Sequence, residues 1–257
     1  MAKVFLSAGH GGTDPGAVGY GLKEKDINLN VLKACRDELK AHRVKVVCSR
    51  EKDENDSVGQ EVREANASKA DIAVSFHINA GGGDGFEAFC STKNKDGVKL
   101  AKLGEKYIKA LGQNSRGVKD GLHLYFVKNT NMTSVLFETF FIDTKDNTIG
   151  DTASEQKVIG VAYAKAILEY LGIKHKELKE ELKTTKPKTQ ASTTKDESYK
   201  VKITTNILNV RAGAGVNFNV KTKVKKGEVY TIVGTKNGWG KLKSGKGWIN
   251  LDYAQRI

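Results

Sequence analysis

The chain has 257 residues, of which 39% are hydrophobic and 28% charged, so it is too apolar for a disordered chain and long enough for one large and one small domain. Its three cysteines, Cys35, Cys48 and Cys90, form no Cys-x-x-Cys pair, which argues against a disulfide framework and a thiolate zinc knuckle. No apolar run approaches the roughly 18 residues of a membrane helix, and the N-terminal pattern is unlike a secretory signal. We therefore expect a protein made in the cytoplasm without a signal peptide or transmembrane segment.

Positive charge is concentrated in the last part of the sequence. Of the net charge of +13, residues 1–173 contribute +1, residues 174–198 contribute +2, and residues 199–257 contribute +10 from 12 basic and 2 acidic side chains. A block this basic favours contact with a polyanion such as nucleic acid, an acidic membrane surface or an anionic wall polymer. A purely solubilising surface is an equally good explanation from composition alone.

Residues 1–173 alternate between strand-like and helix-like patterns. We expect strands over 4–7, 44–48, 71–76, 85–90, 123–127 and 134–137, and helices over 26–42, 58–69, 98–112 and 155–171. Such an alternation predicts an α/β domain with a mostly parallel sheet flanked by helices.

The remaining residues change in character twice. The first half of residues 174–198 is charged, and the second half is rich in Thr, Ser and Lys with no large apolar side chain, which predicts an interdomain linker. Short β-rich runs over 199–203, 208–211, 229–233, 239–242 and 247–249 follow, separated by glycine-containing turns. Residues 199–257 are therefore expected to form a small all-β barrel.

Four side chains in the first domain are candidates for chemistry. His10 follows the first strand, Glu24 precedes a helix, His77 ends a strand, and Glu138 follows the apolar run 135–137. Two histidines and a carboxylate form a ligand set for catalytic zinc, and a second carboxylate can serve as the base. The intervals of 14 and 53 residues match no compact metal signature, however, and histidines at strand ends commonly have structural roles. The residues alone leave both interpretations open.

Several segments resemble the zinc-dependent N-acetylmuramoyl-L-alanine amidases of type 3, the AmiC-like family. They are residues 7–17 (SAGHGGTDPGA), 24–26 (EKD), 75–80 (SFHINA), 85–87 (GFE) and 135–138 (VLFE), in the family's order. This resemblance covers residues 2 to about 172. It implies Zn²⁺ held by His10, Glu24 and His77, with Glu138 as the catalytic carboxylate. The chain departs from the family at Thr139, where a glycine is common.

The resemblance implies hydrolysis of the amide that joins N-acetylmuramic acid to L-alanine of the peptidoglycan stem peptide. Zinc would lower the pKa of a bound water, and Glu138 would take its proton and return one to the leaving nitrogen. Asp14, Asn79 and Glu87 are candidate supporting residues, and Glu87 is the rival of Glu138 as base.

The C-terminal residues resemble a bacterial SH3-like wall-targeting domain through residues 206–211 (NILNVR), 237–242 (NGWGKL) and 247–249 (GWI). The resemblance makes Trp239, Trp248, Tyr253 and Arg211 candidate wall-binding residues. Barrel core is the alternative for the two tryptophans, and a structural role is the alternative for Arg211. We expect the partners to be Gram-positive peptidoglycan and an anionic wall polymer, with no nucleic acid.

Together these features favour a phage endolysin that reaches the wall after a holin permeabilises the membrane. A bacterial autolysin or an amidase for lysis of the spore mother cell is the alternative. A non-catalytic wall-binding protein is an alternative of another class, and binding of nucleic acid by residues 199–257 is a weaker one.

Overall fold

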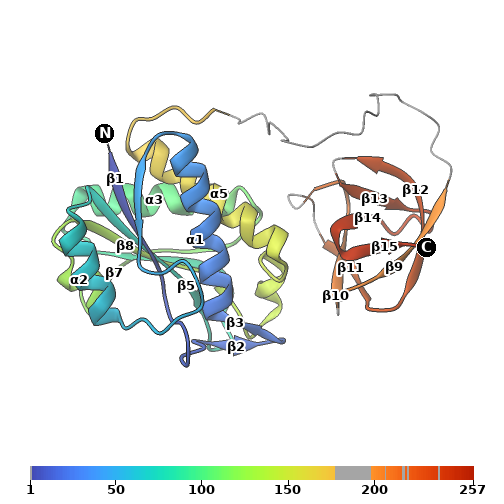
Figure 1. Cartoon of the computed structure of the whole chain (residues 1–257), viewed down its shortest axis with the longest axis horizontal. Coiled ribbons are helices and arrows are strands. Elements are labelled where there is room, and N and C mark those ends of the chain that lie inside the picture. Colours follow the sequence, from blue (N-terminus) through green and yellow to red (C-terminus); the bar gives the residue numbers. More distant parts are fainter. Residues whose placement is uncertain (1, 177–197, 206, 216–217, 219, 237) are drawn as a thin grey trace. The chain divides into compact units, whose positions relative to one another are not determined.

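The computed structural model describes residues 2–176, 198–205, 207–215, 218, 220–236 and 238–257 (Figure 1). The chain divides into two compact units, Met1–Leu178 and Lys179–Ile257. Most of the predicted linker 174–198 lies outside the described residues, as do Asn206 and Asn237 of the C-terminal motifs.

The first unit is built on a six-stranded sheet in the order β4-β1-β5-β8-β6-β7. The strands are β1 (Lys3–Ala8), β4 (Lys45–Cys48), β5 (Ile72–Asn79), β6 (Phe86–Cys90), β7 (Ser115–Asp120) and β8 (Thr133–Phe141). Neighbouring strands run parallel except that β6 is antiparallel to β8. The predicted mostly parallel sheet is therefore confirmed.

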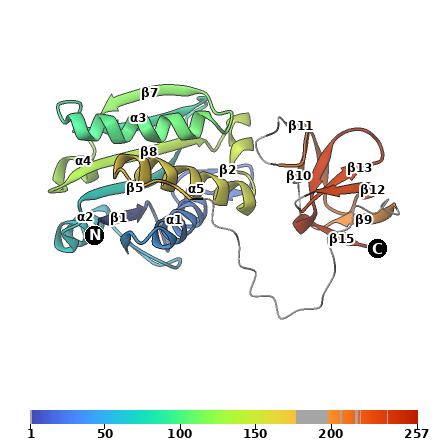
Figure 2. The ribbon, with the colours of Figure 1, turned by 90° about the horizontal axis from the view of Figure 1, so that it is seen from above.

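Helices cover both faces of this sheet (Figures 1 and 2). One face packs against α1 (Glu24–Ala41), α3 (Lys95–Lys109) and α5 (Ala153–Tyr170), and the other against α2 (Val58–Ser68) and α4 (Tyr125–Asn129). Alternation along β1 shows why both faces are covered. Leu6 belongs to the core under α1, α3 and α5, whereas Phe5 packs with Val62 of α2 and Phe126 of α4.

Several predicted elements differ from the observed ones. The strand expected over 123–127 is wrong, because residues 125–129 form helix α4. The short hairpin of β2 (Val18–Gly19) and β3 (Leu22–Lys23), strand β7 and the 3-10 helix η1 (Lys145–Ile149) were not predicted. Strands β5 and β8 continue past their predicted ends to Asn79 and Phe141, with a register irregularity after the pair His77 and Glu138.

The second unit is a seven-stranded antiparallel sheet in the order β11-β10-β14-β13-β12-β9-β15. Its elements are β9 (Tyr199–Ile203), β10 (Ile207–Arg211), β11 (Val220–Lys225), β12 (Val229–Lys236), β13 (Trp239–Leu242), β14 (Trp248–Asn250), η2 (Leu251–Tyr253) and β15 (Ala254–Arg256). Inward side chains such as Val201, Leu208, Ile232 and Ile249 form a core of its own. The predicted all-β unit is confirmed, although β11 and β15 were not anticipated.

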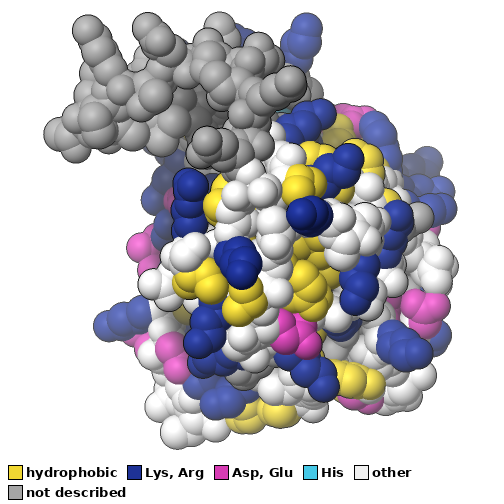
Figure 3. All heavy atoms as spheres, turned by 90° about the vertical axis from the view of Figure 1, so that its right-hand side faces the viewer, with side chains coloured by type: hydrophobic (Ala, Val, Ile, Leu, Met, Phe, Trp, Pro, Cys, Tyr) yellow, Lys and Arg dark blue, Asp and Glu magenta, His cyan; other side chains and the backbone are white. Residues whose placement is uncertain are grey.

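Three further features bear on the expectations from composition. All three cysteines are free thiols. No helix among the described residues is long and apolar enough to cross a membrane. The surface drawn in Figure 3 carries many lysine and arginine side chains around smaller apolar areas.

Candidate active site

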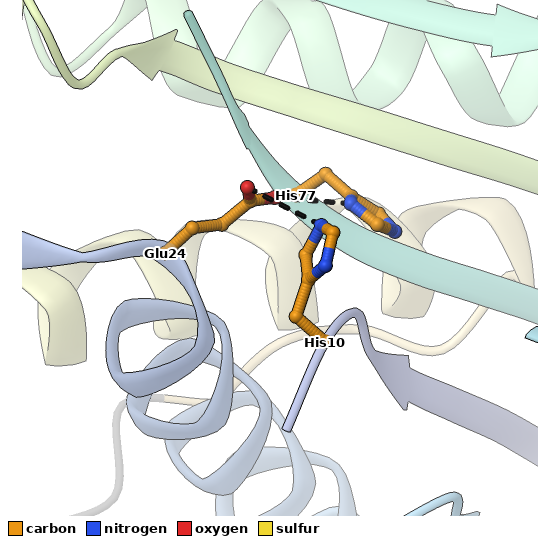
Figure 4. Close-up of side chains that lie close together, drawn as sticks. All are labelled: His10, Glu24 and His77. Atoms are coloured by element: carbon orange, nitrogen blue, oxygen red, sulfur yellow. Dashed lines mark hydrogen bonds and ion pairs between the residues drawn. The ribbon is translucent and has the colours of Figure 1, made fainter. Parts of the chain in front are cut away.

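His10, Glu24 and His77 lie together at the carboxyl edge of the sheet (Figure 4). Their candidate ligand atoms all lie within 4.8 Å of one another. His10 Nε2 is 3.3 Å from Glu24 Oε2, and His77 Nδ1 is 3.0 Å from Glu24 Oε1. Two expected positions need correction, because Glu24 is the first residue of α1 and does not precede it, and His77 is followed by two further residues of β5.

Two glycines allow the loop after β1 to come this close. A Cβ atom at Gly9 would lie 2.1 Å from Cε1 of His77, and one at Gly16 would lie 2.6 Å from Oε2 of Glu24. Gly16 also has a φ of +63°, in the left-handed region that favours glycine. The glycine-rich sequence around His10 is thus required by the packing of the site.

The Glu24 carboxylate is buried and held by several donors. Its Oε1 accepts hydrogen bonds from the backbone nitrogen of Ile78 at 2.9 Å and from Nδ2 of Asn28 at 3.3 Å, and its Oε2 accepts one from the backbone nitrogen of Ala17 at 2.8 Å. Asn28 also donates to the carbonyl of Gly9, which links α1 to the His10 loop. Asn28 lies within an ordinary helical pattern, so the sequence does not predict this role.

Burial and charge act in opposite directions in this cluster. Burial alone would raise the pKa of Glu24, but hydrogen bonds from His10 and His77 hold it far below its ordinary value. The bond with Glu24 raises the pKa of His10 to about 9. Burial lowers the pKa of His77, but the hydrogen bond with Glu24 and the charges of Glu138 and Glu24 together outweigh it, so that the pKa is raised. Glu24 is therefore held as a carboxylate.

The outer nitrogen of His10 has its own partner. Nδ1 of His10 lies 2.8 Å from Oδ2 of Asp14, which leaves Nε2 facing Glu24.

The Arg50 guanidinium, which is buried, donates to the carbonyls of Ala8 and Lys25 at 3.0 and 2.7 Å and so fixes the base of the His10 loop. The sequence alone does not predict this positioning role of Arg50.

Glu138 lies beside His77 at paired positions of β8 and β5. It sits within β8, not at its end as expected, because the strand continues to Phe141. Oε2 of Glu138 is buried and has no hydrogen-bond partner among the described residues. Burial raises the pKa of Glu138 to about 7. A buried carboxyl with a free oxygen and this pKa is suited to proton transfer near neutral pH.

Glu87 on β6 lies on the other side of Glu138 from His77, and Asn79 of β5 contacts Glu87. Nδ2 of Asn79 donates to Oε2 of Glu87 at 3.1 Å, and Glu87 is paired with Glu138 across β6 and β8. Arg116 and Lys119 form ion pairs with Oε1 of Glu87. Glu87 is thereby neutralised by two cations, whereas Glu138 has no such partner among the described residues.

A cleft of about 510 Å³ opens onto His10 and His77. Its other walls come from α2, α4 and the segment before α2, including Asp56, Val58 and Tyr125. Val58 and Tyr125 are exposed, so the cleft has an apolar rim next to the histidines. The sequence does not predict a helix at this cleft, because the pattern of residues 123–127 favours a strand.

A second cluster, Glu38, His42 and His175, also brings two imidazoles near a carboxylate. Hydrogen bonds account for its geometry. His42 Nδ1 donates to the Glu38 carbonyl at 2.9 Å, His42 Nε2 accepts from the backbone nitrogen of Lys176 at 3.0 Å, and His175 Nε2 lies 2.9 Å from Oε1 of Glu38. The cluster ties the residues after α5 to the C-terminal end of α1.

The candidate wall-binding residues differ in exposure. Trp239 is buried in the second unit, and Trp248 and Tyr253 are half-buried. Arg211 is buried, and its Nη1 donates to the carbonyl of Phe218 at 3.0 Å.

Two family profiles match the chain, that of the N-acetylmuramoyl-L-alanine amidases over residues 4–169 and that of bacterial SH3 domains over residues 207–255. The endolysin of Bacillus phage SPP1 is 36% identical over 94% of this chain and 93% of its own length. The sporulation-specific N-acetylmuramoyl-L-alanine amidase of Bacillus subtilis is 34% identical over 56% of this chain and 58% of its own length.

Solved structures agree with these sequence matches. The catalytic domain of CwlV, an amidase from Bacillus (Paenibacillus) polymyxa, superposes with a TM-score of 0.63 and 30% identity over 68% of this chain and all of that domain. AmiC2 of Nostoc punctiforme gives a TM-score of 0.62 at 29% identity over 66% of this chain and 97% of its own. On its sequence, its fold and the extent of both matches, this chain belongs to the N-acetylmuramoyl-L-alanine amidase family and is a peptidoglycan amidase with a bacterial SH3 domain.

Proposed function

We propose that the amidase is zinc-dependent, with His10, Glu24 and His77 as the ligands. The observation that carries this proposal is the convergence of two imidazoles and one carboxylate to within 4.8 Å. The donor set fits zinc, since catalytic zinc sites commonly use two histidines and a carboxylate. Asp14 behind His10 is a further support, because metal-binding histidines usually give their second nitrogen to a carboxylate.

These three residues would hold a zinc ion, which would act as a Lewis acid toward the carbonyl of the scissile amide. Glu138 takes a proton from the attacking water at its free, buried Oε2 and returns a proton to the nitrogen of the leaving L-alanine. Both oxygens of Glu87 are already engaged, one by Asn79 and the other by Arg116 and Lys119. Glu138 is therefore the base in this proposal, and Glu87 is not.

The second unit is proposed to hold the enzyme on Gram-positive walls. Its 12 basic and 2 acidic side chains between residues 199 and 257 favour an anionic wall polymer as the ligand. The half-buried Trp248 and Tyr253 are the candidates for contact with glycan, whereas the burial of Trp239 and Arg211 favours structural roles for both.

The biological role that we propose is host lysis as a phage endolysin. The match to the SPP1 endolysin supports it, because that match spans both units whereas the match to the sporulation-specific amidase covers 56% of this chain. Expression in a Gram-positive host tests this role. Lysis that requires co-expression of a pore-forming membrane protein is expected, and wall turnover without such a protein would favour an autolysin.

Digestion of purified walls tests the activity and the metal together. We expect new L-alanine amino termini without new reducing sugars, loss of their release on chelation, and recovery on adding zinc. New reducing ends would indicate a glycosidase. Wall binding without any release would indicate a non-catalytic binding protein, and release that persists in chelator would contradict the zinc proposal.

Two variants separate the base from the ligands. Glu138→Gln is expected to lower kcat by about 10²- to 10⁴-fold while one zinc per chain is retained, because only proton transfer is removed. His77→Ala is expected to lose both the metal and activity. Metal content by atomic emission and turnover on the same samples provide the check, and full activity in Glu138→Gln would exclude Glu138 as the base.

A further inference from the structure

A row of charged side chains crosses the sheet away from the candidate zinc ligands. His77 on β5 is paired with Glu138 on β8, and Glu138 is paired with Glu87 on β6. On β7, the register shifts so that Arg116 and Gly117 lie opposite Glu87. Side chains at paired positions of neighbouring strands project from the same face. The row therefore leads from a metal ligand, through two carboxyl groups, to a guanidinium.

Two cations share one carboxylate at the far end of this row. Arg116 Nε and Lys119 Nζ both contact Oε1 of Glu87, the latter at 2.5 Å. Glu87 is buried, whereas the side chains of Arg116 and Lys119 are 47% and 39% exposed. One buried negative charge thus positions two positive charges that still reach solvent, and the group carries a net charge of one positive unit.

Aromatic rings add to this positioning. The Arg116 guanidinium carbon lies 5.3 Å from the ring centre of Phe141, and Lys119 Nζ lies 5.9 Å from that of Phe89. A cation above an aromatic ring is stabilised there and loses less freedom when it binds a ligand. The two cations are therefore positioned by aromatic rings as well as by Glu87.

We propose that Arg116 and Lys119 form a subsite for a carboxylate of the stem peptide. This inference rests on the proposed cleavage at the His77 and Glu138 end of the row. Arg116 and Lys119 both reach Glu87, which is two strand spacings from His77, or about 10 Å. An extended peptide covers that distance in about three residues. In a stem peptide whose glutamate is linked through its side-chain carboxyl group, the α-carboxylate of that glutamate stays free. This α-carboxylate is the group that we place in the subsite.

Charge balance gives a second reason for the subsite. Glu87 balances only one of the two cations, so the group keeps one net positive charge that attracts an anionic part of the stem peptide. Guanidinium and ammonium groups bind carboxylates through charge-assisted hydrogen bonds. In the proposed subsite, Arg116 and Lys119 supply this positive charge to the carboxylate of the leaving peptide.

Two soluble substrates test the subsite with the intact protein. Both are N-acetylmuramoyl-L-alanyl-γ-D-glutamyl peptides, one with the free α-carboxylate of glutamate and the other with its α-amide. We expect the wild type to show a KM at least about tenfold lower for the acid, with similar kcat, because a charged hydrogen bond contributes to binding and not to bond cleavage. Equal KM values for the two substrates would overturn the proposal.

Variants show whether the two cations cause the preference. Arg116→Gln and Lys119→Gln are expected to raise KM for the acid and leave KM for the amide nearly unchanged, so the preference shrinks. The charge-conserving variants Arg116→Lys and Lys119→Arg should recover part of it. Lys106→Gln is the matched control, because Lys106 is an exposed lysine of α3 that pairs with Glu169.

The outcomes distinguish this inference from the proposed function. A merely structural role through Glu87 would lower kcat/KM equally for both substrates in the glutamine variants, and that result would also overturn the subsite. If a variant does not fold, the KM values of the wild type for the acid and the amide still test the subsite. Cleavage of neither substrate by the zinc-loaded wild type would contradict the proposed function itself.

Discussion

Asp14 shows how a single exposed residue can act on the candidate metal site without touching a metal. Its Oδ2 fixes the orientation of His10 through Nδ1 at a distance of 2.8 Å. We expect Asp14→Ala to weaken zinc affinity by about 10- to 100-fold while kcat at saturating zinc changes little. Competition with a chromogenic chelator measures the affinity.

Asp37→Ala is a suitable control for that measurement, because Asp37 is an exposed aspartate that pairs with Arg36 on α1. Unchanged zinc affinity in Asp14→Ala would mean that His10 is positioned by its loop and by Glu24 alone.

Asp56 provides a prediction about pH and stability. Burial, together with the neighbouring Glu61 and Glu64, raises its pKa to about 6. Because the pKa is higher in the folded than in the unfolded chain, ionisation of Asp56 destabilises the fold as pH rises from about 4 to 6. Asp56→Asn should therefore stabilise the protein at pH 8 by roughly 1 kcal/mol, after allowance for partial exposure, with no gain below pH 4.

Thermal melts of wild type and Asp56→Asn at pH 4 and pH 8 provide the check. A gain in Tm that is the same at both pH values would show that the effect comes from packing or hydrogen bonding instead of charge.

At the scale of elements, the contact between α1 and α5 depends on a glycine. A Cβ atom added to Gly160 would lie 2.5 Å from the Val31 carbonyl oxygen and 2.6 Å from Cβ of Ala34. Gly160→Ala would force the two helices apart, and we expect it to lower the free energy of unfolding by about 1–3 kcal/mol. Urea denaturation measures this change.

Gly59 of α2 is the matched control, since a Cβ atom there meets only Nη1 of Arg63 at 3.5 Å. Gly59→Ala should stabilise the protein by up to about 1 kcal/mol through helix propensity. Destabilisation by both substitutions would contradict the steric explanation for Gly160.

The sequence predicted elements well where apolar runs were long or periodic, and poorly where they were short. Residues 123–127 resemble a strand because the short apolar run 124–127 fits either a strand or a buried helical turn, and tertiary packing against α2 selected the helix. Strand β7 was missed because it is an edge strand whose residues include Arg116, Gly117 and Lys119.

The sequence predicts only part of the candidate site. His10 and His77 fall at strand ends that topology brings together, but spacing alone could not choose between a metal site and structural histidines. The family resemblance named the ligands and Glu138. The roles of Asn28, Arg50 and Arg116 depend on contacts between distant segments, which no local pattern reports.

At the scale of the whole molecule, the two units have separate hydrophobic cores. We expect residues 1–178 alone to cleave soluble muropeptides with an unchanged kcat/KM and to bind purified walls more weakly than the full chain. Binding by the full chain should weaken as salt increases, because it depends on the basic residues 199–257. Sedimentation with walls at low and high salt measures both effects.

A preference of the full chain for DNA over purified walls in the same salt series would contradict a wall ligand and favour nucleic acid.

The order of elements also sets when each unit can finish folding during synthesis. Helix α5 covers α1 and α3, so the catalytic unit completes its core once residue 170 has left the ribosome. In the second unit β15 pairs with β9, so its sheet is complete only after residue 256. At usual rates of translation the interval is on the order of ten seconds. Each nascent chain therefore carries a folded catalytic unit before its SH3 unit is complete.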